Sequence, residues 1–156
     1  MSGWISKDKA LQKLQKYCAY QDRCHQEVRT KLIDLGIYGD DLENIIVLLI
    51  EDNFLNEERF AQSYARGKFR MKKWGRVRIK RELKQRKISD YCIRKGMAEI
   101  DNETYLNTLR EILQKRQVQY AHLKPFEVRK KMADHAIRRG YEVPLVWEMV
   151  KGMVAG

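Results

Sequence analysis

Apolar residues recur at helical spacing along nearly the whole chain of 156 residues. The first segment shows this in five residues that would share one face of a helix, namely Ala10, Leu11, Leu14, Tyr17 and Cys18. The strict alternation of apolar and polar residues that marks a half-buried strand is almost absent. The pattern therefore predicts an all-α protein.

The helical pattern repeats as a unit of three helices. At the ends of the second helices, three apolar positions of the first unit match three of the second at a constant offset of 51 residues and align with three of the third. These positions are Val28, Leu32 and Ile37, then Ile79, Leu83 and Ile88, then Met132, Ala136 and Tyr141. The expected helices span about residues 10–18, 25–35 and 42–51, then 56–71, 76–86 and 89–99, then 102–120, 125–139 and 144–153.

A unit of about 50 residues buries little apolar surface by itself, so neighbouring units must pack on one another. We therefore predict three tandem three-helix repeats, each resembling a helix-turn-helix, in one elongated body. The predicted repeats are residues 1–53, 54–101 and 102–156.

Charge is concentrated in the middle of the chain. Residues 40–58 hold seven acidic residues and no Lys or Arg, whereas residues 59–95 hold fifteen basic residues against two acidic ones, a formal charge of +13. The whole chain has a net charge of +11, so the positive field belongs to the central segment. Such a field favours a polyanionic partner, which could be nucleic acid, an anionic membrane face or an acidic protein.

The helix expected at residues 76–86 carries most of the candidate binding surface. Its basic residues lie along and around the helix, which favours contact with phosphates or carboxylates over the readout of base edges. A solvated basic face without a dedicated partner is the alternative. The residues expected to bind are Arg70, Lys72, Lys73, Arg76, Arg78, Lys80, Arg81 and Lys84, with a second, weaker area at Arg129, Lys130 and Lys131.

Trp74 lies in the turn before that helix, next to Gly75. A Trp side chain can stack on an unpaired base, a contact worth about 1–3 kcal/mol in single-strand binding proteins. It can equally fill the space between two repeats, and we favour this structural role. Gly75 is expected to allow a left-handed or tight backbone.

Residue patterns typical of an enzyme are missing from the sequence. There is no glycine-rich phosphate loop, no cluster with metal-ligand spacing and no pattern of Ser or Cys with a base that is typical of a catalytic nucleophile; the adjacent Cys24-His25 could touch a metal, but a buried thiol is the favoured interpretation. We therefore expect no enzymatic activity, no cofactor and no metal. Cys18, Cys24 and Cys92 form no C-x-x-C pair, and we expect thiols in a reducing cytosol. The longest aliphatic run, residues 45–50, is far shorter than the ~20 residues of a membrane span, so we expect a cytoplasmic protein.

One block in the middle of the chain is distinctive. It reads DNFLNEERFA at residues 52–61, followed by Ser63-Tyr64, Trp74-Gly75 and IKREL at residues 79–83. Weaker support comes from the helix around Ala10-Leu11, from EVRTKL at residues 27–32 and from RRGY at residues 138–141. Together these segments resemble the RecX family, the small regulators of the RecA recombinase.

The resemblance implies a specific function. Members of this family are built of tandem three-helix repeats, bind in the groove of the RecA–single-stranded DNA filament, and inhibit strand exchange and filament ATP hydrolysis. On this basis we expect a monomeric negative modulator of RecA that acts in recombination, DNA repair and the SOS response. Weak binding to single- and double-stranded DNA, without sequence specificity, is also expected. The alternatives are a stand-alone helix-turn-helix DNA-binding or transcription protein and a helical scaffold for an acidic protein.

Two positions depart from the family pattern. Lys87 stands where the family often has Gly before the closing Ile88, so we expect that C-cap to be built differently from the left-handed one predicted at Gly36. Cys24 replaces the Ser or Thr expected three residues before Glu27, which should weaken that capping box.

Overall fold

Helices dominate the protein, and residues 5–155, which the computed structural model describes, contain no strand. The all-α prediction is confirmed, with helix boundaries close to the expected ones. In chain order the helices are α1 (Lys7–Tyr20), α2 (His25–Asp34), α3 (Gly39–Glu51), α4 (Glu57–Lys72), α5 (Arg76–Gln85), α6 (Asp90–Met97), α7 (Asn102–Gln119), α8 (Pro125–Arg138) and α9 (Val143–Met153).

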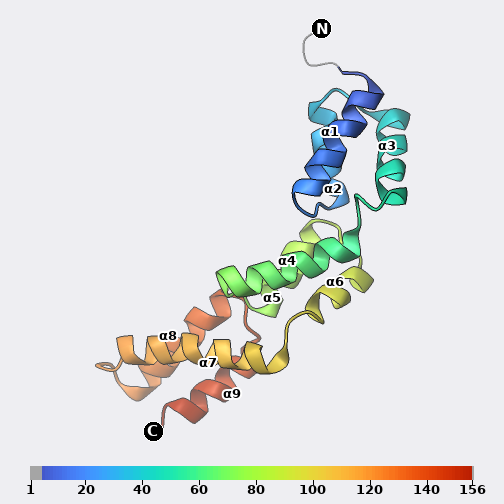
Figure 1. Ribbon diagram of the computed structural model, residues 1–156. Coiled ribbons are helices and arrows are strands. Elements are labelled where there is room, and N and C mark those ends of the chain that lie inside the picture. Colours follow the sequence, from blue (N-terminus) through green and yellow to red (C-terminus); the bar gives the residue numbers. More distant parts are fainter. Residues whose placement is uncertain (1–4, 156) are drawn as a thin grey trace.

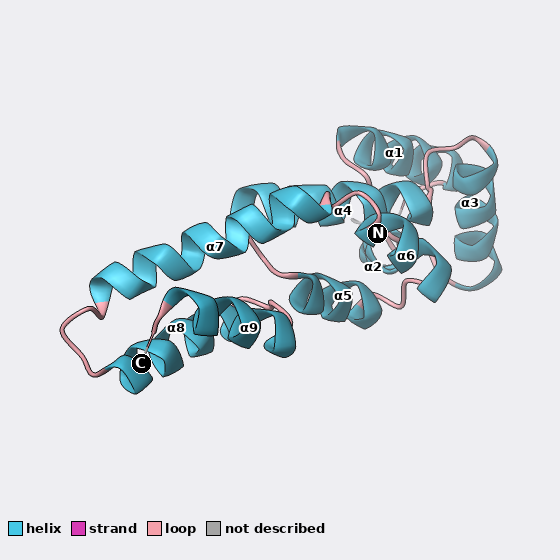
Figure 2. Cartoon of the chain, turned by 90° about the horizontal axis from the view of Figure 1, so that it is seen from below, coloured by secondary structure: helices cyan, strands magenta, loops and turns pink. Residues whose placement is uncertain are grey.

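The helices form three triplets that follow one another along an elongated body (Figure 1). The first repeat contains α1–α3, the second α4–α6 and the third α7–α9, and the two ends of the chain lie at opposite ends of the body. Short loops join the helices within each triplet (Figure 2). Three tandem three-helix repeats are thus confirmed, whereas the predicted boundaries at residues 53 and 101 stay predictions.

Several helices begin at a short polar side chain that caps the first turn. Ser6, Asn56, Ser89 and Asp101 each accept a hydrogen bond from the backbone N–H three residues further on, at 2.9 to 3.2 Å. These bonds satisfy N–H groups that have no partner inside the helix. The polar residues before each apolar stripe therefore fix where four of the helices start.

The second helix of each repeat ends in the same left-handed turn. Gly36, Lys87 and Gly140 have φ angles of 82°, 59° and 102°. In each turn the following residue donates its N–H to the carbonyl five residues earlier, at 2.9, 3.2 and 3.2 Å. The prediction at Gly36 is confirmed. The expectation of a different C-cap at Lys87 is wrong, because Lys87 itself adopts the left-handed conformation.

The buried side chains form two separate clusters. The first cluster consists of α1–α3 side chains together with Leu55, and Phe54 packs against it. The second cluster is shared by α4–α9, so the second and third repeats have one continuous core. Cys24 is the one described residue of the first repeat that packs in this second core. The junction between the first and second repeats therefore differs from the junction between the second and third.

Two glycines bring the backbones of the second and third repeats into direct contact. The N–H of Gly75 donates to the carbonyl of Arg139 and that of Val77 donates to the carbonyl of Gly140, both at 2.9 Å. A Cβ atom on Gly75 would lie 2.2 Å from the carbonyl carbon of Gly140. Gly75 has φ −76°, so of the two expected alternatives, a left-handed or a tight backbone, the left-handed one is wrong. Its role is to permit this close approach.

Candidate functional site

The exposed face of α5 gathers three of the predicted binding residues. Ile79 and Leu83 are fully buried, which turns Lys80, Arg81 and Lys84 outward to solvent. These three side chains line a shallow hollow of about 470 Å³ together with Val77 and Gln85. We call this surface, formed by Val77, Lys80, Arg81, Lys84 and Gln85, the basic face of α5.

The charges on the basic face of α5 are not neutralised within the described part of the chain. No carboxylate of residues 5–155 lies within ion-pair distance of Lys80, Arg81 or Lys84. Lys80 and Lys84 are four residues apart on one helix, where like charges destabilise by a few tenths of a kcal/mol. A bound polyanion would remove this repulsion, so the face is suited to phosphates or carboxylates.

Arg76, also predicted to bind, lies at the junction with the third repeat. Its guanidinium donates to Glu142 Oε2 at 3.1 Å and to Asn102 Oδ1 at 3.0 Å, and it stacks on the ring of Tyr105 at 3.8 Å. The Tyr105 hydroxyl accepts from the Arg76 backbone N–H and donates to Glu142. The positive charge of Arg76 is thus matched by a carboxylate inside the protein.

This junction also sets the ionisation of its members. Burial and the hydrogen bond to Glu142 raise the pKa of Tyr105 well above its ordinary value, so the phenol stays protonated and can donate. Burial alone would raise the pKa of Glu142, but hydrogen bonds from Tyr105 and Arg76 outweigh burial and hold the pKa below its usual range. Glu142 is therefore ionised and holds Arg76 in place.

Trp74 is partly buried and has two cations near its ring. It is half-buried against the core shared by α4–α9. The guanidinium of Arg78 lies 4.1 Å and the ammonium of Lys68 5.0 Å from the ring centroid. Arg78 thus joins Trp74 and does not extend the basic face of α5. Whether Trp74 also stacks on a base stays a prediction.

The last turn of α4 carries the other predicted residues of the central segment. Arg70 and Lys72 are exposed, whereas Lys73 is half-buried and left-handed at φ 55°. The Lys72 carbonyl accepts from Arg139 at 2.6 Å, and the Lys73 carbonyl accepts from the Tyr141 hydroxyl at 3.0 Å. The backbone here is fixed by the third repeat, while the side chains of Arg70 and Lys72 remain available to a ligand.

The predicted second basic area lies on α8. Lys130 forms a weak exposed ion pair with Asp134 at 3.5 Å, and the ammonium of Lys131 lies 5.7 Å from the ring centroid of Tyr120. Arg129 is half-buried, and its guanidinium donates to the carbonyl of Val154 at 3.5 Å. These residues have local contacts that the basic face of α5 lacks.

Sequence reasoning missed two cations beside the predicted ones. The ring centroid of Tyr64 lies 5.4 Å from the ammonium of Lys68, on α4, and 4.9 Å from the guanidinium of Arg86, at the end of α5. Lys68 follows Tyr64 by four residues, a spacing that brings two side chains together on a helix and that could have identified it. The contact of Arg86 joins two helices and left no local signal.

Two kinds of site are not found in residues 5–155. No three His, Cys, Asp or Glu side chains there are grouped so that they could hold a metal ion. None of the described helices combines the length and the apolar character needed to cross a bilayer.

Comparisons with known proteins connect this arrangement to one family. Residues 56–97, which contain α4, α5 and α6, match the family model described as RecX, second three-helix domain. The regulatory protein RecX of Lactobacillus johnsonii is 33% identical over 97 residues, which cover 62% of this chain and 36% of that protein. The regulatory protein RecX of Clostridium acetobutylicum is 26% identical over 133 residues, or 83% of this chain and 61% of that protein. The chain thus spans about a third to three fifths of the length of these two relatives.

A solved structure shows the same fold. The crystal structure of RecX from Lactobacillus salivarius superposes with a TM-score of 0.85 at 22% sequence identity and covers 94% of this chain and 96% of that one. The three-repeat architecture described above is therefore the architecture of that protein. Residues 56–97 thus match the second three-helix domain of RecX, and the chain is similar over most of its length to regulatory proteins named RecX.

Proposed function

We propose that the protein is a negative modulator of the RecA recombinase that binds in the groove of the RecA–single-stranded DNA filament. The basic face of α5 would contact the filament through phosphates or carboxylates, and binding would inhibit strand exchange and ATP hydrolysis. In this function the protein would act as a cytoplasmic monomer and would catalyse no reaction. Weak, sequence-independent binding to free DNA is part of the same proposal.

The observation that carries the proposal is the unpaired charge of Lys80, Arg81 and Lys84 on one exposed face. Other cations predicted to bind, such as Arg76 and Lys130, have carboxylate partners within the protein. A polyanion gains most from cations that have no competing partner, because no existing ion pair must be broken first. The similarity to regulatory proteins named RecX supports the choice of a recombinase filament as this polyanion.

The test replaces Lys80, Arg81 and Lys84 together with Ala and measures inhibition of ATP hydrolysis by RecA on single-stranded DNA. We expect the variant to need at least about tenfold more protein for the same inhibition, because each lost phosphate contact removes released counterions. If all three contact phosphate, the negative slope of log affinity against log salt should become shallower by about 2.

A matched control replaces Lys9, Lys13 and Lys16, three exposed residues of α1, with Ala. This variant loses the same charge away from the basic face of α5 and should inhibit like the parent protein. Equal weakening of both variants would mean that net charge acts without a defined site. If the parent protein does not inhibit at any ratio and selects one strong motif from random duplexes, the helix-turn-helix transcription protein replaces the proposal.

A further inference from the structure

The three repeats are joined by two junctions whose chemistry differs. Between the second and third repeats, Gly75 and Gly140 allow backbone-to-backbone hydrogen bonds, and a common core continues through the contact. Between the first and second repeats the hydrophobic clusters are separate, apart from Cys24, which packs in the second core, and Leu55, which packs in the first. Corresponding positions of the two junctions carry different residues, so the first junction cannot be built like the second.

Cys24 and Lys87 occupy the positions that Gly75 and Gly140 occupy one junction later. Cys24 is the N-cap of α2 as Gly75 is the N-cap of α5, and Lys87 forms the left-handed turn after α5 as Gly140 does after α8. A Cβ atom at either glycine would lie within 2.3 Å of an atom of the neighbouring repeat. Because Cys24 and Lys87 both carry side chains, their backbones cannot approach in the same way.

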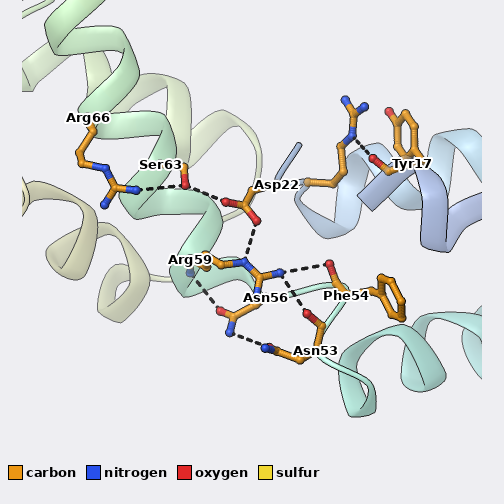
Figure 3. A network of polar contacts seen from close by, with 9 residues as sticks. Tyr17, Asp22, Asn53, Phe54, Asn56, Arg59, Ser63 and Arg66 are labelled. Atoms are coloured by element: carbon orange, nitrogen blue, oxygen red, sulfur yellow. Dashed lines mark hydrogen bonds and ion pairs between the residues drawn. The ribbon is translucent and has the colours of Figure 1, made fainter. Parts of the chain in front are cut away.

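Polar contacts replace the backbone contact at the first junction. Asp22 accepts from Arg59 Nε at 2.6 Å and from the Ser63 hydroxyl at 2.7 Å, and Glu57 accepts from the backbone N–H of His25 at 2.9 Å (Figure 3 shows the contacts around Asp22 and Arg59). No backbone-to-backbone hydrogen bond among the described residues joins α2 to the second repeat. These contacts are part-buried hydrogen bonds, and each contributes only about 0.5–3 kcal/mol net, since folding exchanges it for hydrogen bonds to water.

Open space accompanies these polar contacts. Two grooves separate α2 from the end of α5, with volumes of about 540 and 340 Å³. Gln26 and Thr30 of α2 and Arg86 line both grooves. Gln85 lines the larger groove and also belongs to the basic face of α5. A change in the angle between the first two repeats would therefore open or close space directly beside that face.

We propose that the chain moves as two bodies, α1–α3 and α4–α9, about a hinge at residues 52–56. Asp22, Arg59 and Ser63 form a polar latch that holds the hinge in the conformation described here. Arg59 contacts both the latch and the hinge, because it also donates to the carbonyls of Asn53 and Phe54 in the hinge segment, at 3.1 and 3.2 Å. This inference does not depend on which polyanion the protein binds.

The test measures distances between spin labels by pulsed dipolar spectroscopy in the full chain. Labels attached through encoded ketone residues avoid the native thiols. One pair, at Val47 and Lys95, spans the first junction, and a second pair, at Lys95 and Lys115, spans the second, all at exposed positions. We expect the first pair to give a distance distribution at least about twofold wider than the second, as for domains joined by a small polar interface. Equally narrow distributions for both pairs would overturn the hinge.

The latch is tested with Asp22→Ala in the same labelled proteins. This change should widen the distribution of the first pair and leave that of the second unchanged, which also shows that α4–α9 remain folded. The matched control is Asp41→Ala, which removes the same charge and an ion pair with Lys7 inside the first repeat. An unchanged first distribution in Asp22→Ala, or an equal effect of Asp41→Ala, would contradict the role assigned to Asp22.

Discussion

Single residues at the repeat junctions decide how closely the backbones approach. Sequence patterns predicted a special backbone at Gly36 and Gly75, but only the structure separates the two roles. Gly36 is needed for its left-handed φ of 82°, whereas Gly75 has an ordinary φ and is needed for the absence of a side chain. Lys87 shows the converse, since a lysine gives no local sign that it will adopt φ 59°.

Replacing Gly75 with Ala should therefore destabilise the protein. The new methyl group would overlap the backbone at Gly140, and overpacking of this kind costs about 1–3 kcal/mol. Gly67→Ala is the matched control, because Gly67 lies inside α4 with nothing within 4 Å of its missing Cβ. That variant should gain about 0.4–1 kcal/mol. Urea unfolding gives both free energies, and a neutral Gly75→Ala would refute the close contact.

At the scale of the helices, α5 combines two roles that its sequence does not distinguish. Periodicity predicted the buried stripe of Ile79 and Leu83 and, from it, the outward face that carries Lys80, Arg81 and Lys84. The same reasoning grouped Arg76 with these residues. The partner of Arg76 is Glu142, 66 residues away, and a single sequence contains no signal for a pairing across two repeats.

The contact between α5, α7 and α9 is expected to depend on the hydroxyl of Tyr105. Tyr105→Phe keeps the ring but leaves the N–H of Arg76 and the carboxylate of Glu142 each without one partner. Loss of a partner at a buried polar group costs about 1–3 kcal/mol, which chemical denaturation should detect. Tyr91→Phe on the exposed side of α6 is the control and should change stability by less than about 0.5 kcal/mol. If Tyr105→Phe lowered stability no more than Tyr91→Phe, the buried hydroxyl would be dispensable.

At the scale of the whole molecule, the sequence predicted three equivalent repeats, whereas the structure pairs two of them and sets one apart. The repeat itself was predictable because helical periodicity and the turn before Ile37 and Tyr141 are local features. The pairing was not predictable because it depends on which glycines of different repeats meet in space. Leu55, assigned by position to the second repeat, is buried in the first core, and Phe54 packs against that core.

This division predicts two cooperative units in unfolding. In the described chain the first cluster contains eleven buried residues and the shared cluster twenty-one. Native-state hydrogen exchange in rising denaturant should therefore show α1–α3 losing protection before α4–α9. Helices α6 and α9 serve as the internal control and should lose protection together, since they share a core. Loss of protection by all nine described helices at one denaturant concentration would contradict this division.

Because α4–α9 share one core, they would rotate as one rigid body. The displacement of an atom in such a body grows with its distance from the rotation axis. The 18 residues of α7 alone extend this body by about 27 Å at 1.5 Å per residue. By simple geometry, a rotation of about 10° would displace a point at that distance by about 5 Å, close to one helical turn. A small rotation at the first junction would thus move Lys130 and Lys131, which lie on α8 in the third repeat, by several ångströms relative to the first repeat.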